Sequence, residues 1–185
     1  MSEITPILAH WANFYVMTGS AAAALTGLMF VVITLVFGEK RVSGSPDGIG
    51  TFSTPTVLHF CNALLVSATL VAPWHTLIVV EPVVGLIGLC GVVYVCRLIV
   101  RQRGLSNYRP DLEDWTWYTF VPFAAYATVL SGAILLHFMP IKALFVIGAA
   151  VVLLIFTGIR NSWDVVTYLA TNRDDEPPAS GPKTG

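Results

Sequence analysis

Five long runs of apolar residues, separated by short polar or proline-containing segments, make up most of the chain. A helix needs about 20 apolar residues to cross the bilayer core, whereas a membrane barrel shows alternating segments of about 10 residues. The pattern therefore predicts an all-α, polytopic membrane protein built as a bundle of five transmembrane helices. The predicted spans cover about residues 12–37, 57–80, 83–100, 115–138 and 141–160.

Helix-breaking residues mark the connections between these spans. Residues 38–56 are rich in Gly, Ser and Thr and include two prolines, which predicts a loop. Glu81-Pro82 leaves almost no room between the second and third spans, so these helices are expected to form a tight hairpin. Met139-Pro140 separates the fourth span from the fifth.

These boundaries divide the chain into three parts. Residues 1–11 are expected to form a short tail outside the membrane, and residues 12–170 the transmembrane domain. The last helix is expected to continue past the membrane to about Ala170. Residues 171–185 are rich in acidic residues, proline and small polar residues, which predicts a disordered cytoplasmic tail.

Basic residues are distributed unequally over the two sides that five spans define. The side of the N-terminus holds one, Lys142, and the opposite side holds nine. Because basic residues accumulate on the cytoplasmic side of a membrane protein, we expect the N-terminus outside and the C-terminus inside. The nine are Lys40, Arg41, Arg97, Arg101, Arg103, Arg109, Arg160, Arg173 and Lys183.

Composition agrees with a membrane protein. Hydrophobic residues make up 55% and charged residues 11%, with a mean hydropathy of +0.73, whereas soluble domains carry about 25% charged residues. The net charge of −1 excludes a basic nucleic-acid-binding protein. All three cysteines, Cys61, Cys90 and Cys96, lie in predicted spans without a Cys-x-x-Cys spacing, so we expect buried apolar residues rather than disulfides or zinc ligands.

Small residues form two stripes in the predicted helices. Gly19, Ala23 and Gly27 recur every four residues, which lets another helix backbone approach, either within the chain or at a subunit interface. The third span is expected to lie centrally in the bundle because three small residues thin it: Gly85, Gly88 and Gly91.

Two prolines fall inside predicted spans, Pro73 in the second and Pro122 in the fourth. Each removes a backbone donor, which predicts a kink. Pro73 also frees the carbonyl of Thr69, which must find another donor or line a wet cavity. A static kink and a cavity wall or hinge both remain open.

Polar residues at membrane depth are the main candidates for function, because they are costly in lipid. His59 and Asn62 are three residues apart and share a helix face. His59 either takes up protons near neutral pH or donates to a backbone carbonyl as a helix anchor.

A cluster of charges is expected at the cytoplasmic boundary. Arg160 and Asp164 are four residues apart and can pair along the fifth helix. Arg97 and Arg101 on a neighbouring helix either compete for Asp164 in a structural cluster or help to form an anion or lipid-headgroup site.

Three histidines lie in the outer half, His10, His75 and His137, with Glu81 nearby in sequence. Two of them on different helices, such as His75 and His137, could ligate haem, and three with a carboxylate could bind a divalent metal. No metal-binding spacing supports this, so ordinary interfacial histidines with no cofactor and no metal are the favoured interpretation.

Motifs of soluble enzymes are missing from the sequence. It has no Walker A loop, dinucleotide-binding glycine pattern, Gly-x-Ser-x-Gly turn or His-Glu-x-x-His helix, and its polar segments are too short to fold as a soluble domain. No catalytic residue can be assigned, and the sequence points away from an enzyme.

Three segments, residues 19–30, 54–60 and 159–164, resemble a family of small bacterial multi-pass membrane proteins. The resemblance covers most of the membrane region but not the C-terminal tail. It implies a location in the bacterial inner membrane and brings no assigned activity or catalytic residue.

Three functions follow from these features. The first is an accessory, regulatory or assembly protein that acts through helix–helix contacts with a second copy or another membrane protein in the lipid bilayer. The alternative is a small oligomeric channel or transporter whose path is lined by the Pro73 helix. The third is a redox protein with haem or a metal at His75 and His137.

Overall fold

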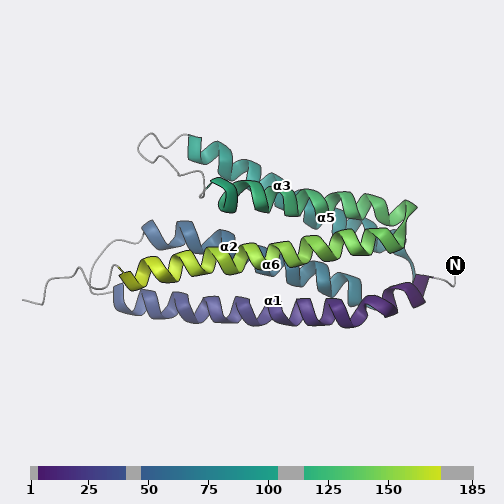
Figure 1. Cartoon of the computed structure of the whole chain (residues 1–185), viewed down its shortest axis with the longest axis horizontal. Helices are drawn as coiled ribbons and strands as arrows, with labels where there is room; N and C mark the ends of the chain where they lie inside the picture. Colours follow the sequence, from purple (N-terminus) through teal and green to yellow (C-terminus); the bar gives the residue numbers. More distant parts are fainter. Residues whose placement is uncertain (1–3, 41–46, 104–114, 172–185) are drawn as a thin grey trace, which may run out of the picture.

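The computed structural model describes residues 4–40, 47–103 and 115–171, and in this part of the chain every regular element is helical (Figure 1). The predicted all-α class is therefore confirmed. The elements are α1 (Ile4–Lys40), α2 (Asp47–Val71), α3 (Leu77–Arg103), the π-helical turn η1 (Thr116–Phe120), α5 (Val121–Phe138) and α6 (Pro140–Thr171).

Four segments are long and apolar enough to cross a membrane. They are Ile7–Thr34, Leu77–Val100, Thr116–Phe138 and Pro140–Asp164, whereas the apolar part of α2 is shorter, Pro55–Val71. The chain thus has the helices of a membrane protein, and the fifth crossing, by α2, stays a prediction.

Consecutive helices run in opposite directions, so the connections alternate between two ends of the bundle (Figure 1). The start of α1, the α2–α3 connection and the α5–α6 turn share one end, here called the N-terminal end. Lys40, Arg103 and Thr171 close α1, α3 and α6 at the other, the C-terminal end.

Four of the helices form a ring, and α1 packs outside it. In the ring α3 contacts α5, α5 contacts α6 and α6 contacts α2, with a smaller contact between α2 and α3. α1 packs mainly on α2, with a smaller contact to α6. The expectation of a central third span is therefore wrong, because among the described helices α6 packs on α1, α2, α5 and η1, whereas α3 packs on α2, α5 and η1.

The glycines of α3 instead serve its close contact with α5. A Cβ added at Gly88 would lie 2.7 Å from the backbone nitrogen of Leu130, and one at Gly91 would lie 2.1 Å from the Tyr126 ring. No side chain fits at these distances, so the two backbones approach as only glycine permits.

The predicted hairpin at Glu81-Pro82 is wrong. α2 ends at Val71 and α3 begins at Leu77, so Glu81 and Pro82 lie inside α3. The connection lies instead at residues 72–76, because a proline at position 73 cannot continue the helix.

Pro73 therefore ends α2 rather than kinking it. The carbonyl of Thr69, which Pro73 leaves without its helical donor, accepts a hydrogen bond of 2.6 Å from the indole Nε1 of Trp74. The Thr69 carbonyl was expected to need another donor, and the indole N–H of Trp74 supplies it. This carbonyl therefore lines no wet cavity.

Pro122 lies at the start of α5, directly after η1. The backbone N–H of Val121 donates to the carbonyl of Thr116, the longer step of a π turn. Pro122 was expected to kink the fourth span, and the irregularity found there is a π turn directly before Pro122.

Helices also extend into segments predicted to be irregular. α1 begins at Ile4, so most of the predicted outside tail is helical. α2 begins at Asp47, a residue type favoured at helix starts, and contains Pro55, so the predicted loop over 38–56 is wrong for its second half. The predicted tail after Thr171 lies outside the described residues, whereas the end of α6 agrees with the expected end near Ala170.

Candidate functional site

A buried group of polar side chains joins α2 to α5 across the ring. The Nδ1 atom of His59 lies 2.9 Å from the hydroxyl oxygen of Tyr126. The amide of Asn62 donates to the same oxygen at 3.0 Å. His59 and Tyr126 are 1% and 0% exposed. We refer to His59, Asn62 and Tyr126 as the polar triad.

The hydrogen bonds of the polar triad select a tautomer for His59. Because Asn62 already donates to the Tyr126 oxygen, the single hydroxyl proton of Tyr126 is best used as a donor to His59 Nδ1. Nδ1 then accepts, and the imidazole proton sits on Nε2. The expected anchoring of His59 to a backbone carbonyl is replaced by a side-chain partner on another helix.

The polar triad lies near the middle of the spanning segment. Tyr126 is ten residues after Thr116 and twelve before Phe138, the limits of that segment. At about 1.5 Å per residue, each end is about 15–18 Å away, which is about half of a hydrocarbon core of about 30 Å.

Other buried polar residues follow the same helix. On α2, Thr56 and Ser67 are fully buried and Thr69 is 7% exposed. The Ser67 hydroxyl lies 3.2 Å from the Thr18 hydroxyl of α1. α2 thus has a polar buried face, which suits a segment less apolar than the other four.

Asn161 on α6 differs from these residues. Its side chain is 0% exposed, and neither its amide nitrogen nor its oxygen has a hydrogen-bond partner in the described part of the chain. An unpaired buried amide costs about 1–3 kcal/mol. One turn before it, Gly158 packs against the ring of Phe60 on α2, with 2.4 Å from an added Cβ to the ring.

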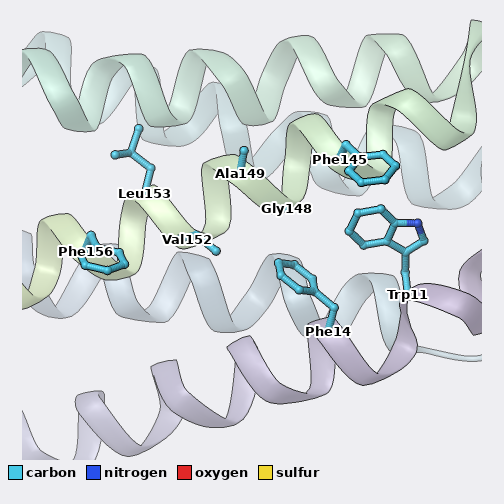
Figure 2. Close-up of a pocket in the computed structure, with 8 residues that line it drawn as sticks. All are labelled: Trp11, Phe14, Phe145, Gly148, Ala149, Val152, Leu153 and Phe156. Carbon is cyan, nitrogen blue, oxygen red and sulfur yellow. The ribbon is translucent and has the colours of Figure 1, made fainter.

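An apolar groove lies between α1 and α6 on the outside of the bundle (Figure 2). Its volume is about 680 Å³. Aromatic rings stand at its start, where Trp11 meets Phe145 edge-on with centroids 4.6 Å apart. The lining residues are Trp11, Phe14, Phe145, Gly148, Ala149, Val152, Leu153 and Phe156.

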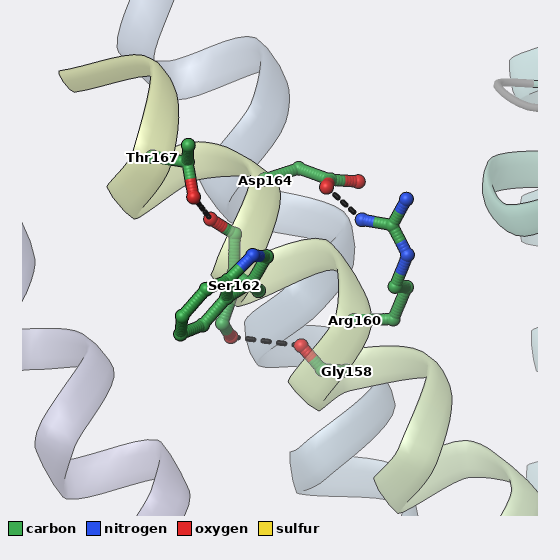
Figure 3. Close-up of polar contacts among 6 residues, drawn as sticks. Gly158, Arg160, Ser162, Asp164 and Thr167 are labelled. Atoms are coloured by element: carbon green, nitrogen blue, oxygen red, sulfur yellow. Dashed lines mark hydrogen bonds and ion pairs between the residues drawn. The ribbon is translucent and has the colours of Figure 1, made fainter. Parts of the chain in front are cut away.

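The predicted charge cluster at the C-terminal end is only partly assembled. Arg160 pairs with Asp164 one turn along α6, which confirms that contact (Figure 3). The Arg160 guanidinium also lies 5.9 Å from the centre of the Trp117 ring of η1. Arg97 is exposed on α3, which does not pack closely on α6, and the side chain of Arg101 lies outside the described residues.

Hydroxyls around this pair donate to backbone carbonyls of α6. Ser162 donates to the carbonyl of Gly158 at 2.8 Å, and Thr167 donates to the carbonyl of Trp163 at 2.8 Å (Figure 3). Ser162 is also 3.2 Å from the sulfur of Met29 on α1. These hydroxyls thus bond within α6 or to the neighbouring α1, and the anion or lipid-headgroup site expected at Arg97, Arg101 and Arg160 stays a prediction.

The outer histidines His75 and His137 lie in exposed positions at the N-terminal end of the bundle. His137 Nδ1 lies 3.3 Å from a carboxylate oxygen of Glu81, and the histidine side chain is 67% exposed. His75 is exposed in the α2–α3 connection. Within the described residues no three His, Cys, Asp or Glu side chains group closely enough to hold a metal ion. All three cysteines are exposed on the helices, where burial was expected.

The stripe of small residues on α1 is divided between two surroundings. Gly19 is buried, and an added Cβ would lie 3.0 Å from the Cβ of Ser67 on α2. Ala23 and Gly27 are exposed, and a Cβ at Gly27 would meet nothing within 4 Å.

Two residues of these sites were not identified from the sequence. Tyr126 sits in an apolar run as one aromatic among many, and Asn161 sits beside the charged residues of the inner boundary. Helical spacing alone relates neither residue to His59, since each lies on another helix.

Comparisons with protein-family models, curated proteins and solved structures give no match to this chain. The resemblance to small bacterial multi-pass membrane proteins therefore stays an expectation.

Proposed function

We propose that the chain crosses a bacterial inner membrane five times, with its N-terminus outside and its C-terminus inside. The alternation of helix ends supports this arrangement, because it places the described basic residues Arg97 and Arg160 toward one end and Lys142 toward the other. A reporter that is active only in the periplasm, fused after Gly185, should stay silent. Periplasmic activity of that fusion would contradict the proposal.

Within this membrane we propose an accessory or assembly function carried out through helix–helix contacts of α1. One observation carries the proposal, namely the position of Gly27. Among the eight glycines whose surroundings are described, seven have a neighbouring side chain or backbone within 4 Å of an added Cβ, and Gly27 has none. Glycine weakens a helix by about 0.5–1 kcal/mol relative to alanine. Close packing against another helix usually compensates for this destabilisation.

Helix geometry explains why Gly27 faces outward while Gly19 does not. Four residues advance the helix by about 400°, so positions eight residues apart differ by about 80°. Gly19 contacts α2, whereas Gly27 lies with exposed Ser20 and Ala24 on a smooth face. A partner helix, from a second copy or another membrane protein, would cover Ser20, Ala24 and Gly27.

The test is a bulky substitution on this face with a matched control. Gly27→Leu should abolish the native assembly in native mass spectrometry of the membrane-extracted protein. Ala21→Leu, exposed on the same helix about 120° away, should leave the assembly intact. Because a Cβ at Gly27 meets no side chain or other helix within 4 Å, the fold should accept the leucine, and an unchanged circular dichroism spectrum of the variant separates loss of assembly from misfolding. An unchanged mass in both variants would remove the proposal.

A small channel or transporter is the second candidate, and the polar triad favours it. A histidine, an asparagine and a tyrosine bonded to one another at mid-membrane are costly without a function, and the unpaired Asn161 adds a further polar group. Flux of protons or small solutes in liposomes, reduced by His59→Gln or Asn62→Leu, would support this function. Absence of flux across a broad panel would count against it.

A haem or divalent metal at His75 and His137 is the third proposal. An absorption spectrum and metal analysis of the purified protein test it directly. A Soret band or a stoichiometric metal lost in the His137→Ala variant would support this assignment.

A further inference from the structure

The groove between α1 and α6 has the dimensions of a lipid chain rather than of a soluble ligand. From Phe145 to Phe156 it follows eleven residues of α6, which at about 1.5 Å per residue is about 16 Å. One leaflet of the hydrocarbon core is about 15 Å deep. The groove therefore extends over one leaflet, beginning near the N-terminal end of the bundle.

The chemistry of the lining also matches an acyl chain. Most of the groove is formed by aliphatic and phenyl side chains, so it offers little to a polar ligand (Figure 2). Its volume of about 680 Å³ falls within the usual range for ligand sites of about 300–1,000 Å³. The groove also lies between two helices that are apolar enough to cross a membrane, so lipid chains surround it.

A basic residue, Lys142, precedes the first lining residue of the groove on α6 by three positions. Lys142 lies seven and eleven residues before Ala149 and Leu153, about two and three turns of α6, so it shares their face. Its side chain is exposed, and none of the described carboxylates lies within salt-bridge distance. The indole nitrogen of Trp11, at the same end of the groove, faces away from Phe14 (Figure 2).

We propose that this groove and Lys142 together bind one anionic phospholipid, with an acyl chain between α1 and α6 and the phosphate at Lys142. The lipid belongs to the leaflet at the N-terminal end of the bundle. Lys142 supplies the preference for an anionic headgroup, and the groove supplies a defined position for the chain. The site lies on a different face of α1 from Gly27, so it is independent of the helix contact proposed above.

Native mass spectrometry of the full chain, released from nanodiscs of equal phosphatidylglycerol and phosphatidylcholine, tests the proposal. The wild type should retain one phosphatidylglycerol in preference to phosphatidylcholine. One basic residue near a membrane surface contributes about 1 kcal/mol, which corresponds to about five-fold in binding. Lys142→Gln should therefore lower the ratio of the two retained lipids by about five-fold, and Arg97→Gln, which removes an exposed charge at the other end, should not.

A second pair of variants tests the groove itself. Ala149→Phe fills the groove and should lower retention of both lipids by at least five-fold. Ile159→Phe, which adds an aromatic ring at an exposed position of the same helix outside the groove, should have no effect. Equal retention of both lipids by the wild type, or retention unchanged in Lys142→Gln and Ala149→Phe, would overturn the proposal. So would a dimer that Ala149→Phe separates, because the groove would then hold a second copy of the chain.

Discussion

Replacing Gly88 by alanine should loosen the contact between α3 and α5. An added Cβ would lie 2.7 Å from the backbone nitrogen of Leu130, 3.0 Å from its Cα and 3.1 Å from its Cβ. Favourable contacts between such atoms are about 3.5–4.0 Å long. Because backbone atoms cannot rotate away as a side chain can, the two helices must separate by several tenths of an ångström.

The size of the effect follows from overpacking. Forcing an extra carbon into a filled core costs about 1–3 kcal/mol. Gly85→Ala is the matched control, since the same atom is added to the same helix at 3.6 Å from the Cβ of Ala133, an ordinary contact. Both variants gain the same helix propensity, so the difference between them isolates the contact with Leu130.

Reversible unfolding in mixed micelles, titrated with a denaturing detergent and followed by circular dichroism, measures this difference. We expect Gly88→Ala to be about 1–3 kcal/mol less stable than Gly85→Ala. If the two variants unfold at the same detergent fraction, then α3 and α5 do not approach as closely as the glycines of α3 suggest.

Three further substitutions can be measured in the same unfolding assay. Tyr126→Phe removes the hydrogen bonds to His59 and Asn62. It should lower the free energy of unfolding by about 1–2 kcal/mol, because such bonds in membranes average about 0.6 and reach about 1.7 kcal/mol. Wild-type stability of this variant would show that the polar triad does not hold α2 to α5. Asn161→Leu replaces an unpaired buried amide by an apolar side chain of similar size. It should raise the free energy of unfolding by about 1–2 kcal/mol. A lower stability of this variant would instead reveal a hydrogen-bond partner for the amide. Asp164→Asn breaks the ion pair with Arg160, in which each side chain is about one-third exposed. The free energy of unfolding should therefore change by less than about 0.5 kcal/mol. A loss above about 1 kcal/mol would indicate a buried network.

The all-α class and the presence of several helices apolar enough to cross a membrane followed from the sequence, but some helix ends did not. Residues 72–76 carry no acidic or basic residue other than His75, whereas Glu81 carries a full charge and resembles a boundary. Backbone hydrogen bonding sets the end of α2. Pro73 has no N–H to donate to the carbonyl of Thr69, and the indole of Trp74 donates to that carbonyl instead. Predictions based on a polarity window place the turn at the charge, while the helix ends where its hydrogen-bond ladder fails.

The candidate site was predictable only in its local parts. The Arg160–Asp164 pair follows from helical spacing within one element. The partner of His59 does not, because Tyr126 lies 67 residues away in an apolar run. The stripe at Gly19 and Gly27 was recognisable as a packing signal. Every four residues rotate a helix by about 40° beyond one full turn, so the two glycines lie on different faces of α1.

The outward face of α1 is the central claim, and photocrosslinking in native membranes tests it most directly. A photoreactive residue at position 27 should give a discrete adduct with a second copy or one partner protein, while the same residue at position 21 should react with lipid alone. Adducts of equal yield from both positions, or none from position 27, would contradict the assignment of this face to a helix partner.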